Sequence, residues 1–107
     1  MKLWIDDVRP APEGYIWCKS VNEAKDVLII GEKREKEKDL NILWGIELID
    51  IDHDAGDYAN DGGDYIKLLD WLEETGRNYP IRIHSMNVVG VENMRRIIHK
   101  NGWKEVK

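Results

Sequence analysis

Short apolar runs alternate along this chain with longer stretches in which apolar residues recur every three or four positions. Strands that alternate with helices favour a mainly parallel sheet, because each crossover helix carries the chain back to the start of the next strand. The expected strands are residues 3–5, 15–18, 47–51, 81–84 and 103–106. The sequence therefore predicts an α/β fold, a three-layer sandwich with a mainly parallel sheet of about five strands and helices on both faces.

Local signals indicate where the first helix begins and ends. Ser20 and Glu23 have the spacing of a capping box, so a helix is expected to follow them. Gly31 is expected to interrupt this helix. Residues 32–39 mix charges of both signs, which predicts a solvated helical extension or a loop without a function.

Two further helices are expected later in the chain. Residues 64–75 carry apolar side chains at helical spacing, and Gly76 ends the run. Asn87 can cap the last helix, which Gly102 ends.

The connections between the expected elements are unusual at two places. Residues 6–14 include Pro10 and Pro12 and are too few for an ordinary crossover helix, so the first crossover helix is predicted to be missing. Residues 54–63 are polar and rich in glycine, which predicts a permissive loop that could close over a ligand.

Length and charge narrow the class of protein. The 107 residues fit one domain, residues 1–107. A net charge of -5 argues against binding to duplex DNA, since that affinity comes mainly from Lys and Arg on the phosphates. The single cysteine, Cys18, and the absence of a signal-like or membrane-spanning run lead us to expect a cytoplasmic protein that does not enter a membrane.

Polar clusters follow three of the expected strands: Asp6-Asp7, Asp52-His53-Asp54 and His84-Ser85. In an open parallel sheet, ligands bind in the crevice outside the carboxyl ends of the strands. We therefore expect the three clusters to converge on one site.

The aspartates are the candidate metal ligands. Asp6 and Asp7 are adjacent carboxylates that suit a hard cation, Mg²⁺ above all, although a turn and helix-cap pair is the alternative. Asp50, Asp52 and Asp54 alternate along one strand and so share a face. Asp50 is expected to form local hydrogen bonds, which leaves Asp52 and Asp54 as site candidates.

Two histidines are candidates for proton transfer. His53 and His84 each end an expected central strand, and imidazole gives and takes protons near neutral pH. On opposite sides of a phosphorus atom, one could activate water while the other protonates the leaving oxygen. The alternative is that each is a satisfied structural residue, and His99 is expected at the surface.

Three further side chains could orient a phosphate. Arg9 could contact it bidentately, unless it forms a surface ion pair with Glu13. Ser85 and Asn87 offer a hydroxyl and an amide at a helix start, unless they serve only as a cap. Ser85 lacks an adjacent base with its own orienting group, so we do not expect a nucleophile there.

The segments 3–9, 51–56 and 83–90, with Asn93 and Met94 after them, are similar to the cyclic-phosphate processing receiver family. The similarity extends over nearly the whole chain. It implies a divergent receiver-like, flavodoxin-like fold and a role in processing cyclic phosphate ends, including those of RNA.

The resemblance also implies roles for individual residues. It would place a metal, Mg²⁺ or Mn²⁺, near Asp6, Asp7 and Asp52. It would also give His53 and His84 a part in chemistry that differs from that of an ordinary receiver, with cleavage of a phosphate ester in place of phosphoryl transfer to the protein. The predicted function is a metal-dependent phosphoesterase that acts on a small phosphorylated ligand or an RNA end, with catalytic residues His53, His84 and Asp54.

Compared with an ordinary phosphoacceptor receiver, Asp52 matches the phosphorylated aspartate and Ser85 matches the hydroxyl residue. The helix after the first strand is missing, no Lys-Pro pair follows the last strand, and the chain stops at Lys107 before the usual final helix, so output through that final helix is not expected. Two alternatives remain: a signalling receiver phosphorylated on Asp52, and a phosphate-binding module without catalysis.

Overall fold

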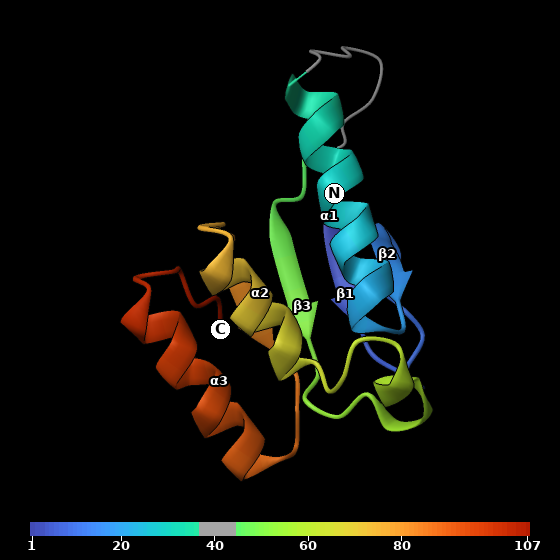
Figure 1. Cartoon of the computed structure of the whole chain (residues 1–107). Helices are drawn as coiled ribbons and strands as arrows, with labels where there is room; N and C mark the ends of the chain where they lie inside the picture. Colours follow the sequence, from blue (N-terminus) through green and yellow to red (C-terminus); the bar gives the residue numbers. More distant parts are fainter. Residues whose placement is uncertain (37–44) are drawn as a thin grey trace.

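The computed structural model describes residues 1–36 and 45–107 as a parallel sheet with helices against it (Figure 1). The strands are β1 (Lys2–Ile5), β2 (Tyr15–Cys18), β3 (Leu48–Ile51) and β4 (Ile81–Ile83). The helices are α1 (Val21–Lys36), α2 (Ile66–Glu74), α3 (Val88–Lys100) and the short 3₁₀ helix η1 (Gly56–Asn60).

All strand pairs in the sheet are parallel, in the order β2-β1-β3-β4. This confirms the receiver-like α/β fold and the mainly parallel sheet. The expected fifth strand at residues 103–106 forms only one bridge, between Ile81 and Glu105, so the sheet has four strands within residues 1–36 and 45–107. Since β4 ends after Ile83, the last segment has little strand to pair with.

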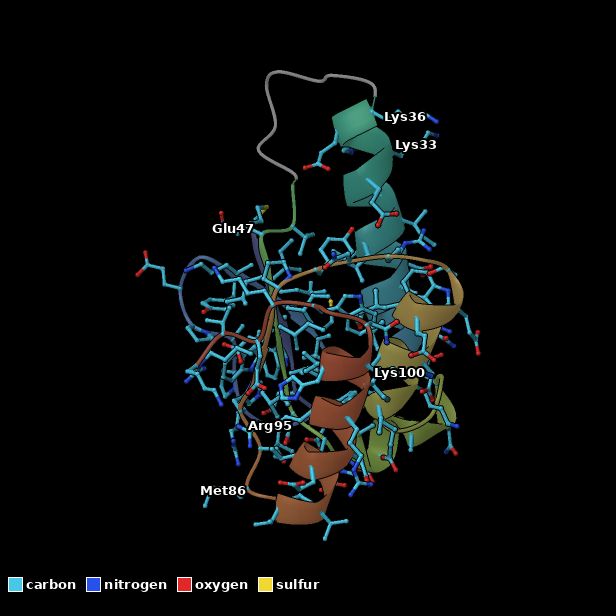
Figure 2. The ribbon with its side chains drawn as sticks, turned by 90° about the vertical axis from the view of Figure 1, so that its left-hand side faces the viewer. Lys33, Lys36, Glu47, Met86, Arg95 and Lys100 are labelled. Carbon is cyan, nitrogen blue, oxygen red and sulfur yellow. The ribbon has the colours of Figure 1, made fainter. Side chains whose placement is uncertain are left out.

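The core lies on one face of the sheet. Alternate strand residues such as Leu3, Ile49 and Ile81 are fully buried there, together with residues from all three α-helices. Figures 1 and 2 show α1, α2 and α3 on the same side of the strands. In the described part of the chain the helices and sheet thus form two layers, whereas helices on both faces were expected.

The direction of the chain across the sheet explains this layering. From β2 the chain moves to β3 and then to β4, and right-handed crossovers in one direction put their helices on one face. The connection from β1 to β2 runs the other way and would cover the opposite face. Residues 6–14 form that connection without a helix, as predicted.

Two tryptophans lie on the opposite face of the sheet, which the missing helix would have covered, and hydrogen-bond to the 6–14 loop. The indole N–H of Trp4 donates to the carbonyl of Arg9 at 2.9 Å, and that of Trp17 donates to the carbonyl of Asp6 at 2.7 Å. Both bonds tie the 6–14 loop to the sheet. The loop that follows β1 is therefore held in place at the carboxyl edge.

The cap signals are confirmed in the structure. The hydroxyl of Ser20 accepts the N–H of Glu23 at 3.1 Å, and the side chain of Asn87 accepts the N–H of Gly90 at 3.0 Å. Gly76 and Gly102 follow α2 and α3 with φ of +68° and +69°, a conformation that glycine adopts without strain.

The expected interruption at Gly31 is wrong, because α1 continues through this buried residue to Lys36. Packing of the helix on the core outweighs the low helix propensity of one glycine, about 1 kcal/mol. The helical extension is confirmed over 32–36, and the rest of the expected 32–39 segment lies outside the described residues. Glu32 in this extension accepts hydrogen bonds from Arg77 and Tyr79.

No helix in the described ranges is long and apolar enough to cross a membrane.

The Glu32 contacts predict a pH-dependent contribution to stability. Burial raises the pKa of Glu32, but its bonds with Arg77 and Tyr79 outweigh burial and lower the pKa below its usual value. The contribution is therefore fully present above the pKa of the unfolded chain and is lost as the pH falls through the folded pKa. We expect Glu32→Gln to cost about 1 kcal/mol at pH 7, after allowance for solvent screening, and much less at pH 3.

Urea unfolding at both pH values measures this effect, with Glu74→Gln on the exposed side of α2 as the control. Equal costs of Glu32→Gln at pH 7 and pH 3 would contradict the assignment.

Candidate functional site

The carboxyl ends of β1, β3 and β4 point to one edge of the sheet, where the 6–14 loop, η1 and the start of α3 also lie (Figure 1). Parallel pairing causes this convergence, since Ile5 is level with Ile51 and Ile51 with Ile83. The residues that follow these three positions are the predicted polar clusters, which the structure brings together.

Asp6, Asp7 and Asp52 form a carboxylate cluster at this edge. One oxygen of each lies within 4.8 Å of the others. Gly56, at φ +55°, comes so close that a Cβ atom there would lie 2.3 Å from Oδ2 of Asp7. A larger residue would be strained at this φ and would displace the Asp7 carboxylate, so glycine suits the point where the start of η1 meets the cluster.

The charges of the cluster affect one another. Burial raises the pKa of Asp7, and the neighbouring charges of Asp6 and Asp52 raise it further. For Asp6, burial also raises the pKa, but the backbone N–H groups of Arg9 and Val8, with His84, outweigh it and lower the pKa. Three carboxylates that repel each other and offer oxygen ligands fit a hard divalent cation such as Mg²⁺ or Mn²⁺.

His53 lies beside this cluster and has one open ring nitrogen. Its backbone N–H donates to Oδ1 of Asp52 at 2.8 Å, and its Nδ1 is 2.8 Å from Oδ1 of Asp54. In the described residues, Nε2 of His53 has no hydrogen-bond partner. The Asp54 contact assigns the proton to Nδ1 and leaves the Nε2 lone pair available as a base.

Gly90 makes room for the His53 ring. A Cβ atom at Gly90 would lie 2.3 Å from Cδ2 of His53, well inside van der Waals contact. Asn87 lies next to the ring: its Oδ1 caps α3, and its Nδ2 is 3.3 Å from Nδ1 of His53, a contact that is not a hydrogen bond when Nδ1 carries the proton for Asp54. Sequence reasoning found His53 and Asn87 but gave Gly90 no role.

His84 reaches the same edge in a different environment. Its Nδ1 is 2.6 Å from Asp50 and its Nε2 is 3.0 Å from Asp6, while its side chain is only 7% exposed. The ring also stacks on Trp4 at 3.8 Å between centroids. Neither nitrogen is open to a ligand in this arrangement. The geometry therefore does not favour the expected arrangement, in which His53 and His84 lie on opposite sides of one phosphorus atom.

Asp50 differs from its predicted role. Local hydrogen bonds were expected, but its fully buried carboxylate accepts bonds from Arg82 and from His84 on the neighbouring strand. The signal for this contact was in the sequence: Arg82 and His84 alternate on one strand as Asp50 and Asp52 do on another. Only the register of β3 with β4 shows that they face each other.

The predicted phosphate-binding residues lie around the site. Nη1 of Arg9 donates to the carbonyl of His84 at 3.3 Å, and the hydroxyl of Ser85 accepts the N–H of Asn87 at 3.1 Å. Ser85 and Asn87 thus have the local capping contacts of the alternative interpretation, and their phosphate role stays a prediction. Asp54 is 63% exposed, and His99 is exposed as expected.

A comparison with protein-family models matches residues 1–100 to the cyclic-phosphate processing receiver domain. The comparisons with curated proteins and with solved structures find no match. The family match covers all three polar clusters.

The repulsion at Asp7 predicts opposite effects of Asp7→Asn with and without metal. Because the raised pKa reflects an ionised form that is disfavoured in the fold, the variant should melt about 2–4 °C higher than the wild type in EDTA at pH 7. Mg²⁺ at about 100 times its dissociation constant should stabilise the wild type by about 2.7 kcal/mol and the variant much less. Differential scanning calorimetry measures both shifts.

Asp57→Asn, at an exposed position in η1, is the control and should respond to Mg²⁺ like the wild type. An unchanged Mg²⁺ response in Asp7→Asn would exclude Asp7 as a ligand.

The tight contact at Gly90 predicts that Gly90→Ala moves the His53 ring without unfolding the protein. The methyl group must displace the imidazole, whereas alanine favours a helix by up to about 1 kcal/mol over glycine. Imidazole ¹H–¹⁵N spectra should show new His53 shifts at a nearly unchanged melting temperature. Val89→Ala, at the adjacent exposed position, should leave the His53 signals in place, and unchanged signals in Gly90→Ala would contradict the contact.

Proposed function

Because this chain belongs to the cyclic-phosphate processing receiver domain family, we propose that it is a metal-dependent phosphoesterase that opens cyclic phosphates. The substrate class is a 2′,3′-cyclic phosphate at an RNA end or on a nucleotide. The observation that carries the proposal is an oriented His53 with an open nitrogen, bonded through its backbone to a carboxylate cluster that fits a divalent cation.

Asp6, Asp7 and Asp52 would hold Mg²⁺ or Mn²⁺. When bound, the ion polarises a phosphoryl oxygen and offsets the charge that develops on it. The proximity of the three carboxylates supports this assignment, because burial raises the pKa of Asp7 and the charges of Asp6 and Asp52 raise it further.

His53 is the catalytic base in this proposal. Its Nε2 takes a proton from the attacking water as the new O–P bond forms and the bond from phosphorus to one ribose oxygen breaks. Asp54 holds the Nδ1 proton and so fixes the tautomer in which Nε2 can accept. General base catalysis of this kind contributes about 10²–10⁴-fold to a rate.

The remaining predicted residues would orient the phosphate. Arg9 offers a guanidinium at the edge of the site, and Ser85 and Asn87 lie at the N-terminus of α3, where backbone N–H groups favour an anion. The sequence hypothesis assigns proton donation to the leaving oxygen to His84. Its two carboxylate contacts disfavour that role, and solvent can supply the proton instead.

Phosphorylation of Asp52 is the second candidate function. Asp52 is partly exposed at the end of β3, beside the two aspartates that would hold a metal in an ordinary receiver. A phosphate-binding module without turnover uses the same residues. A cytoplasmic setting, which the buried free thiol of Cys18 suits, is part of both interpretations.

The decisive experiment follows 2′,3′-cyclic nucleotides by phosphorus NMR with Mg²⁺, with Mn²⁺ and with chelator. We expect conversion to one monophosphate isomer that stops with chelator. His53→Ala should lower the rate about 10²–10⁴-fold with little change in melting temperature. His99→Ala removes an exposed imidazole and is the matched control.

The other outcomes separate the alternatives. A stable aspartyl-phosphate after treatment with acetyl phosphate, without conversion of cyclic nucleotides or of an RNA oligomer with a cyclic phosphate end, favours the phosphoacceptor. Metal-dependent binding of these ligands without conversion favours the binding module.

A further inference from the structure

A fully buried carboxylate that is not one of the three proposed metal ligands lies in the middle of the sheet. Asp50 is level with Trp4 on one neighbouring strand and with Arg82 on the other. A buried charge is costly unless it is paired and hydrogen-bonded. Asp50 meets both conditions, because Oδ2 accepts Nη1 of Arg82 at 3.0 Å and Oδ1 is 2.6 Å from Nδ1 of His84.

His84 continues this chain of contacts to the site. Its Nε2 is 3.0 Å from Oδ2 of Asp6, so the ring bridges two carboxylates. Trp4 lies flat against the ring, with an angle of 4° between the two planes. The imidazole is therefore fixed at both nitrogens and on one face.

Asp6 is the residue whose orientation these contacts determine. Its Oδ1 accepts the backbone N–H groups of Val8 at 3.0 Å and Arg9 at 2.9 Å, and its Oδ2 faces His84. Asp6 is itself fully buried. With both oxygens held, the carboxylate has one orientation relative to Asp7 and Asp52.

We propose that Asp50 and His84 are positioning residues that hold Asp6 ready to bind a divalent cation, with Arg82 and Trp4 supporting them. The proposal rests on the metal site of the proposed function. It separates the two histidines: His53 meets the substrate, whereas His84 acts through Asp6.

The cost of burying this network argues that it has such a role. A buried ion pair is often no more stabilising than apolar residues of similar volume, and the neighbouring strand positions Ile49 and Ile51 are apolar. Partners that fix the orientation of metal ligands typically contribute 10-fold to 100-fold to metal affinity.

Calorimetric titration of the full chain with Mn²⁺ tests the proposal. We expect His84→Ala and Asp50→Asn to weaken Mn²⁺ binding by about 10-fold to 100-fold. His84→Gln should retain most of the affinity, because its amide N–H can reach Asp6 in place of Nε2. His99→Ala is the control and should bind like the wild type.

Turnover at saturating Mn²⁺ gives a second measurement. If His84 acts through Asp6, His84→Gln should keep most of the wild-type rate. A rate as low as that of His53→Ala, with normal Mn²⁺ affinity, would make His84 a proton-transfer residue and overturn the proposal. Asp50→Asn keeps the test open if His84→Ala does not fold, since it leaves the imidazole in place.

The measurements distinguish failure of the positioning role of Asp50 and His84 from failure of the metal site. Wild-type Mn²⁺ affinity in both His84→Ala and Asp50→Asn, or in folded Asp50→Asn alone, overturns the positioning role but leaves the site intact. No Mn²⁺ binding by the wild type overturns the metal site, and the proposed function with it.

Discussion

The fully buried carboxylate of Asp50 constrains much of this structure. A charge at that position requires donors from the neighbouring strand, and Arg82 and His84 provide them. Because His84 also bonds to Asp6, the register of β3 with β4 becomes linked to the geometry of the carboxyl edge. The stack on Trp4 joins β1 to the same network.

The missing first crossover helix shapes the other half of the site. Without it, the 6–14 loop is held by the indole N–H groups of Trp4 and Trp17, which bond to its carbonyls. The same loop carries Asp7 and Arg9 and donates two backbone N–H groups to Asp6. A short connection thus replaces a packing element with residues that serve the site directly, while the three described helices bury the opposite face of the sheet.

Most of the fold was predictable from local patterns. Short apolar runs and capping residues such as Asn87 act over a few residues, so strands β1 to β4 and the three helices were found close to their observed bounds. The predicted interruption at Gly31 was wrong, since packing on the core decides where α1 ends. The predicted last strand is reduced to one bridge, since the length of the neighbouring strand β4 limits its pairing. The layering differed because it depends on the direction of each crossover across the sheet.

For the candidate site, the sequence by itself determined which residue types reach the carboxyl edge: the aspartates of two clusters and two histidines. Each follows a strand end, which local apolar patterns reveal. Only the tertiary structure decided their different surroundings, with His53 open at Nε2 against Gly90, and His84 enclosed between Asp6 and Asp50. The physical reason is that hydrogen bonds and burial depend on strand register and on contacts between residues far apart in the chain, which periodicity along one strand does not specify.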